Sequence, residues 1–162
     1  MQFPTVKGSN LLRQEVTLPR DFQGEINLVF VPFYQWHQME VDSWGKLADE
    51  LEQAHSFLHY YELPTLQQMN FFSKTVINEG MRAGIPDPAT RARTITLYIN
   101  KAYFRSQLEM ADEGHIYILL VDKQGEVLWQ ERGAYTPEKA ASLWVKVKEL
   151  IMVRTLAINA SV

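Results

Sequence analysis

An apolar run that leads directly into a helical pattern constrains this sequence more than any other feature. Residues Leu28–Val31 combine β-branched and aromatic side chains, a composition typical of a buried strand. From Val41 to Leu51, apolar residues recur at spacings of three and four, which predicts an amphipathic helix. The sequence therefore predicts a central strand whose end faces the positive end of a helix.

Composition narrows the class of protein. With 162 residues the chain is long enough for a substantial core, and we expect a single domain over residues 1–162. A net charge of -3 gives no basic footprint, so we expect no nucleic-acid partner. No apolar stretch approaches the roughly 20 residues that span a bilayer. The start of the chain does not resemble a signal peptide, so we expect a cytoplasmic protein.

Cysteine is absent from the chain. Its absence excludes disulfides, thiol catalysis, thiol peroxidase chemistry and iron–sulfur ligation by this protein. We expect no catalytic residues, no resident cofactor and no metal.

Alternating strand and helix patterns predict an α/β fold. A β-hairpin around Glu15–Leu18 is expected first, followed by the central strand and the first helix. Thr65 is the expected N-cap of the second helix, on whose buried face we place five apolar residues. These are Leu66, Met69, Phe72, Val76 and Ile77. Further strands are expected at residues 57–62, 94–99, 116–121 and 126–130, and further helices after Asp87, over Lys101–Met110, and after Thr136. We expect a central mixed sheet with helices on both faces. It should be parallel through residues 27–33, 57–62 and 94–99, with residues 116–121 and 126–130 as an antiparallel pair.

This order resembles the redoxin branch of the thioredoxin-like fold, which includes peroxiredoxins and TlpA-like proteins. The likeness is carried by two segments, residues 8–33 and residues 119–138, the second of which contains Asp122-Lys-Gln-Gly125 and Thr136-Pro-Glu138. The resemblance implies a thioredoxin-like fold over nearly the whole chain.

A narrower set of motifs resembles the mitochondrial ATP-synthase assembly factor family. The motifs are Phe3-Pro4, Leu18-Pro19, Asn27-Leu-Val29, Val41-Asp-Ser-Trp44, residues 117–122 and Trp129. That family is itself thioredoxin-like and is described as a chaperone for a membrane subunit. The resemblance implies a protein partner for this chain.

Two departures separate this sequence from redox-active relatives. Redoxins place cysteine where this chain has residues 34–39, and thioredoxins place a cis-proline where it has Gly114-His115-Ile116. Because both the nucleophile and the substrate-clamping proline are missing, the resemblance implies the scaffold and not the reaction.

The residues that follow the central strand are the candidate binding site. His37 is expected at an exposed helix start, where it could bind an anion, act as a weak base, or be an ordinary loop histidine. Trp36 could anchor a partner or cap the core. The spacing of His55 and His59 suits a metal only on a helix, and the pair straddles an expected helix end, so we expect no metal there. The apolar segment 151–158 either extends the last helix over the core or offers a patch to a partner.

Three hypotheses about function follow. The first is a non-catalytic binding or assembly module whose groove takes a protein or peptide. Its expected lining is Phe33, Tyr34, Gln35, Trp36, His37 and His115. The second is a thiol-independent enzyme or small-molecule binder with His37 and Glu40 as the acid–base pair. The third is a structural homodimer without a ligand.

Overall fold

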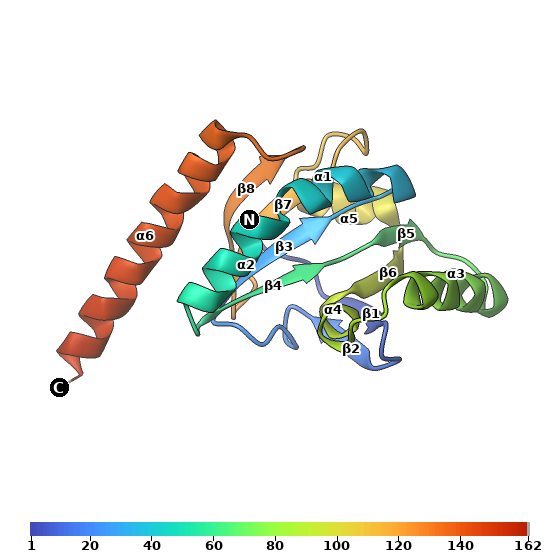
Figure 1. Cartoon of the computed structure of the whole chain (residues 1–162), viewed down its shortest axis with the longest axis horizontal. Helices are drawn as coiled ribbons and strands as arrows, with labels where there is room; N and C mark the ends of the chain where they lie inside the picture. The colour runs from blue at the N-terminus through green and yellow to red at the C-terminus, as the bar shows by residue number, and fades with distance from the viewer. Residues whose placement is uncertain (162) are drawn as a thin grey trace.

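A computed structural model describes residues 1–161, with strands gathered in a central sheet and helices around it (Figure 1). The strands are β1 (Val6–Asn10), β2 (Glu15–Leu18), β3 (Ile26–Val31), β4 (Leu58–Glu62), β5 (Thr65–Gln67), β6 (Ile95–Ile99), β7 (Tyr117–Asp122) and β8 (Val127–Arg132). The helices are η1 (Gln35–His37), α1 (Gln38–Ser43), α2 (Gly45–Ala54), α3 (Phe71–Gly84), α4 (Pro88–Arg93), α5 (Lys101–Gln107) and α6 (Pro137–Ala160).

The strands form two ordered groups, β2-β1-β6-β5 and β4-β3-β7-β8. The chain from β4 to β5 joins them, because the parallel register of Thr65 with Leu97 continues that of Glu62 with Thr94. On the other side of the same segment, the Leu63 amide donates to the Phe30 carbonyl at 2.8 Å. The segment therefore hydrogen-bonds to β3 along one edge and to β6 along the other.

Strand directions agree with the sequence-based expectation. β3 and β4 are parallel, β5 and β6 are parallel, and β7 is antiparallel to both β3 and β8. The expected N-terminal hairpin is formed by β1 and β2.

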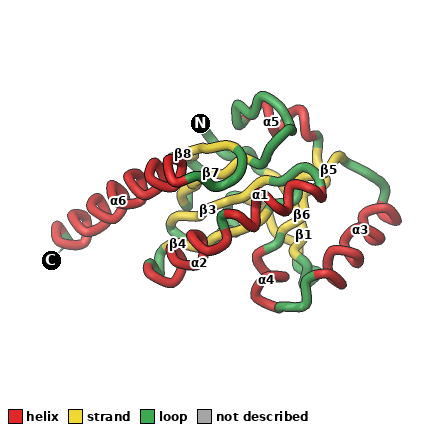
Figure 2. The backbone as a smooth tube through the Cα atoms, turned by 45° about the horizontal axis from the view of Figure 1, so that its top comes forward, coloured by secondary structure: helices red, strands yellow, loops and turns green. Residues whose placement is uncertain are grey.

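Each face of the sheet has its own apolar core. On one face, α1, α2 and α6 pack through residues such as Trp44, Leu51 and Leu143. On the other face, α5 contributes Phe104 and packs with the N-terminal segment around Phe3. Figure 2 shows α1 and α2 lying along β3 and β4, with α6 near β8. The side chains of a strand alternate between these two cores.

The expected start of the second helix was wrong. Thr65 is not its N-cap but the first residue of β5, where its amide donates to the Pro32 carbonyl at 2.9 Å. Pairing with β6 overrides the local capping preference of threonine. The cap is Asn70, whose side chain accepts a hydrogen bond from the Ser73 amide.

The expected buried face of that helix was also wrong. No residue of α3 is buried, and Phe72 and Val76 are 77% and 57% exposed. Leu66 lies in β5 and Met69 in the loop before the helix. The helix lies at the side of the sheet near β5 and β6, so its apolar residues are not covered by a second element (Figure 1).

The last helix is longer than its contact with the core. Segment 151–158 continues α6, and Leu150 and Ile151 still pack against the sheet. Beyond them Met152, Val153 and Leu156 are each more than 60% exposed, and the helix projects away from the sheet (Figure 1). The sequence offered both extension and an exposed patch, and the structure contains both. Among residues 1–161 no helix has the length and apolar character to cross a membrane.

We expect Trp44→Ala to destabilise the protein by about 3–5 kcal/mol. Trp44 is fully buried beside Phe30, and its indole N–H donates to the Gly133 carbonyl at 3.0 Å. Chemical denaturation monitored by circular dichroism measures the loss. Trp36→Ala is the matched control, because Trp36 is 58% exposed and its removal should cost only about 1 kcal/mol. Similar losses in the two variants would contradict this assignment of core and surface.

Candidate functional site

The residues expected to line one groove occupy different environments. Phe33 is buried, whereas Tyr34, Gln35 and Trp36 are exposed just beyond β3. The rings of Tyr34 and Trp36 stack with centroids 6.3 Å apart. His115 is exposed in the loop before β7.

His37 is fully buried, which corrects the expectation of an exposed histidine. Its Nδ1 accepts a hydrogen bond from the Phe33 amide at 2.9 Å, so a neutral ring carries its proton on Nε2. Nε2 makes no hydrogen bond of good geometry. Burial lowers the pKa of His37, which keeps the imidazole neutral. The ring packs edge-on against Trp36 at 4.2 Å, so it supports the turn after β3.

Glu40 closes the space between α1 and the loop before β7. One carboxylate oxygen lies 2.6 Å from Nδ1 of His115, and the other accepts from the Ile116 amide at 2.9 Å. Burial acts to raise the pKa of Glu40, but these hydrogen bonds outweigh it and the pKa is lowered. The backbone donor that an extended peptide would need at this edge is therefore occupied by the chain's own carboxylate.

A second set of hydrogen bonds links the end of β3 to the loop before β7. The Tyr34 hydroxyl donates to Glu113 at 2.8 Å, and Lys101 binds the same carboxylate oxygen at 3.0 Å. Arg105 lies 3.4 Å from the other oxygen. Tyr34 and Glu40 thus tie the end of β3 and helix α1 to the loop before β7, and we call this closed region the thioredoxin-type groove.

An open cavity of about 670 Å³ lies on the other side of the β3 end, and we call it the α3 cleft. Phe33, Tyr34 and Gln35 line it, but His37 and His115 do not. Four fifths of its lining residues come from segments that the sequence did not assign to a site. These residues are Pro32, Gln38, Glu62, Pro64, Leu66, Val76, Ile77, Gly80, Met81, Gly84, Ile85 and Thr94.

Helix α3, which forms one wall of the α3 cleft, carries exposed apolar side chains. Phe71 and Phe72, at the start of α3, are 82% and 77% exposed. Gly80 and Gly84 lie four residues apart on α3, and a Cβ atom built at either position meets no atom within 4 Å. Exposed aromatic side chains beside an open apolar cavity are typical of a binding surface.

Glu62 is the one charged residue among those that line the α3 cleft. Alternation along β4 places Tyr61 in one core and Glu62 on the opposite face of the sheet, toward α1. Glu62 is half-buried, no ion pair reaches its carboxylate among residues 1–161, and the one donor near it is the Gln38 side chain. The nearby Gln38 amide donates to Asp42 at 2.9 Å. Burial raises the pKa of Glu62 to about 7, with a further rise from the charge of Asp42 and partial relief from Gln38.

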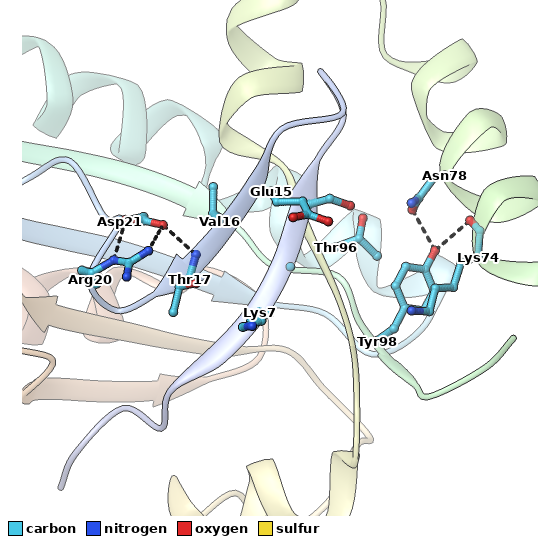
Figure 3. A pocket seen from close by; sticks show the side chains of 12 residues that line it. Lys7, Glu15, Val16, Thr17, Arg20, Asp21, Lys74, Asn78, Thr96 and Tyr98 are labelled. Atoms are coloured by element: carbon cyan, nitrogen blue, oxygen red, sulfur yellow. Dashed lines mark hydrogen bonds and ion pairs between the residues drawn. The ribbon is translucent and has the colours of Figure 1, made fainter. Parts of the chain in front are cut away.

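A smaller cavity of about 470 Å³ lies over β1, β2 and β6 (Figure 3). Its charges largely compensate one another, since Arg20 contacts Asp21 at 3.1 Å and Lys7 faces the same cavity as Glu15. At the other end the Tyr98 hydroxyl donates to Asn78 at 2.7 Å (Figure 3). This mixed-charge surface has less of the character of a binding site than the α3 cleft.

Candidate metal ligands do not cluster in the described part of the chain. No three histidine or carboxylate side chains among residues 1–161 converge as metal ligands. His59 lies 3.8 Å from Glu52, which is itself bound to Arg93 at 2.8 Å.

Sequence reasoning missed Glu62 and most of α3. The available signal for Glu62 was a lone acidic residue at an inward-facing position of a strand. The signal for α3 was weaker, because an apolar helical stripe normally predicts a buried face.

Comparison with known proteins gives one family and one fold. The sequence model of the ATP10 protein family matches residues 1–150. No curated protein matches the chain. Solved structures match nearly its whole length at low identity, and they confirm the thioredoxin-like fold.

Three of these structures illustrate the match. The exposed lipoprotein thioredoxin of Streptococcus pneumoniae is 12% identical, with a TM-score of 0.57 over 90% of this chain and 99% of that one. The DsbE thiol:disulfide interchange protein of Chlorobium tepidum is 16% identical, with a TM-score of 0.55 over 91% and 94%. BsSco, of the Sco family of cytochrome c oxidase assembly proteins, is 12% identical, with a TM-score of 0.60 over 91% and 92%.

Glu62 should make the protein less stable as pH rises. Its pKa is about 7 in the folded state against 4.5 ordinarily, so the folded state binds more protons between these values. Stability attributable to this group is therefore present below pH 4.5 and is lost as pH rises through 7. Glu62→Gln should exceed the wild type at pH 8 by on the order of 2–3 kcal/mol, and the gap should close toward pH 4.5.

Denaturant unfolding at intervals between pH 4.5 and 8 measures this difference. Glu50→Gln, at an exposed position of α2, is the control and should follow the wild type. A pH-independent gap between Glu62→Gln and the wild type would contradict the assignment.

Proposed function

Because this chain belongs to the ATP10 protein family, we propose that it is a non-catalytic, thioredoxin-like module that binds a protein partner during assembly. The partner segment is apolar and enters the α3 cleft. The assembly factor family that its motifs resemble is described as a chaperone for a membrane subunit, and this description supports an apolar client. The match to BsSco supports the use of this scaffold by an assembly protein.

The absence of catalysis is supported by how the polar groups are used. The chain has no cysteine, so it has no thiolate nucleophile. The Nδ1 lone pair of His37 accepts the Phe33 amide, and both oxygens of Glu40 are engaged by the loop before β7. An acid–base pair made of His37 and Glu40 would have to break these contacts before it could act.

The single observation that carries the proposal is the contrast between the two sides of the β3 end. On the β7 side, hydrogen bonds from Tyr34 and Glu40 close the thioredoxin-type groove. On the β4 side, the α3 cleft is open and largely apolar, and exposed Phe71 and Phe72 lie on the helix that forms its wall. Burying such a surface against an apolar partner contributes roughly 25 cal/mol per Å².

We expect the purified protein to show no disulfide reductase and no peroxidase activity above buffer, because no thiolate can attack. Insulin reduction with dithiothreitol and peroxide consumption measure the two activities. Turnover that persists in pure protein and disappears in His37→Ala would contradict the proposal and favour an enzyme.

Filling the α3 cleft should prevent partner binding. A photo-crosslinking residue at Val76, which lines the cleft and is 57% exposed, should capture a protein in the native host. Adding Gly80→Trp should lower the crosslinked yield about tenfold, because the indole occupies open space in the cleft.

Gly45→Trp is the matched control for that experiment. Gly45 also faces open space, but it lies on α2 away from the cleft. The control should leave the yield unchanged, and thermal melts should show both variants folded. A yield that is insensitive to Gly80→Trp, or no capture at Val76, would contradict binding in the cleft.

A further inference from the structure

The α3 cleft combines apolar walls with one carboxylate. Ile77, Met81 and Ile85 of the α3 region line the wall, and Glu62 lies on the sheet beneath them. A buried charge without a partner is costly, so the surrounding fold normally supplies a cation or several donors. Glu62 is half-buried, and here the fold supplies one donor, the Gln38 amide, and no cation.

The cations near the cleft are directed elsewhere. The guanidinium of Arg82 donates to the Leu11 carbonyl, and that of Arg91 donates to the carbonyls of Ile85 and Arg82. Arg93 is bound to Glu52. The nearest charged neighbour of Glu62 is Asp42, which has the same sign. The site is therefore complementary to a positive group that arrives with the ligand.

The shape of the wall favours a helix as the ligand. Gly80 and Gly84 are one helical turn apart on α3, and the space above both is open. Where side chains are absent, the backbones of two helices can approach closely, as in pairs with small residues spaced by four. Apolar helices are commonly bound in grooves of this kind.

We propose that the α3 cleft binds an apolar helix of a partner protein that carries a single arginine or lysine, with the cation placed against Glu62. This inference rests on the proposed function and specifies the chemistry of the partner. The cation satisfies the carboxylate, while the apolar turns of the helix cover the α3 wall and the phenylalanines at its start.

The chain's own α6 offers a related segment, and the structure favours a partner over a second copy. Residues 151–158 are apolar apart from Arg154 and Thr155. Arg154 is already held by Glu25 at 3.1 Å and lies over the Phe57 ring, 4.7 Å from its centroid. Its guanidinium is therefore engaged by its own domain, whereas Met152, Val153 and Leu156 of α6 are exposed.

The test uses the full-length protein and three fluorescent peptides. Each peptide is an alanine–leucine helix of about 16 residues with uncharged serine and asparagine ends and a central arginine, norleucine or glutamate. Fluorescence anisotropy gives the dissociation constants. We expect the arginine peptide to bind about tenfold or more tightly than the norleucine peptide, and the glutamate peptide to bind most weakly.

Variants assign the preference to one residue. In Glu62→Gln the arginine and norleucine peptides should bind within about twofold of each other. Asp42→Asn removes the neighbouring, exposed carboxylate and should retain most of the preference. Denaturation curves confirm that both variants are folded, and Gly80→Trp should weaken all three peptides.

Each other outcome overturns the inference. Equal binding of the arginine and norleucine peptides, or a preference that survives Glu62→Gln, removes the role of Glu62 but leaves the proposed function standing. Binding of no peptide removes the inference, and crosslinking at Val76 then decides the proposed function separately. Self-association that is lost in both Glu62→Gln and Arg154→Gln, measured by sedimentation, would assign the cleft to a second copy instead.

Discussion

Hydrogen bonds on both edges of the β4–β5 segment join the two halves of the sheet, and the other features of the molecule depend on them. Leu63 and Thr65 donate to β3 residues or their successors, and the Pro64 carbonyl accepts from Leu97. Proline interrupts the ladder on one edge only, because it lacks a donor but keeps an acceptor. The N-terminal hairpin is thereby fixed to the central strand through β6, and Glu62 is held in the middle of a sheet.

That arrangement also explains why the two sides of the β3 end differ. Toward β7, a single side chain reaches from α1 to the loop before β7, where Glu40 accepts a hydrogen bond from the Ile116 amide. Toward β4 and β6, the sheet continues but its covering helix lies to the side, so a cavity is left above Glu62 and Thr94. Polar contacts therefore close the β7 side of the β3 end, and an open apolar surface remains on its β4 side.

The sequence predicted the fold well because local patterns and tertiary packing agree there. Alternation and apolar runs located the hairpin, β3, β7 and β8, and the caps Thr136 and Asp87 are formed as expected.

The sequence predicted the site only in part. Tyr34 and Trp36 are exposed after β3, but the burial of His37 depends on the Phe33 amide and three surrounding rings. Hydrophobic periodicity does not predict contacts of this kind, because they depend on the exact path of the turn after β3. For α3 the apolar stripe was recognised but its exposure was not, because periodicity says which residues share a face and not what covers it.

The weak attachment of α3 has a consequence for how tightly the cleft can hold anything. A helix with no buried residue, one interior glycine and a second at its end gains little from its own domain and loses much conformational entropy when it is ordered. We expect the amides of α3 to exchange with solvent faster than those of the neighbouring strands, because the helix unfolds locally at a lower cost. A ligand that orders α3 therefore spends part of its interaction energy on that ordering. We therefore expect moderate affinity and fast release for any ligand of the cleft, which is compatible with the proposed assembly role.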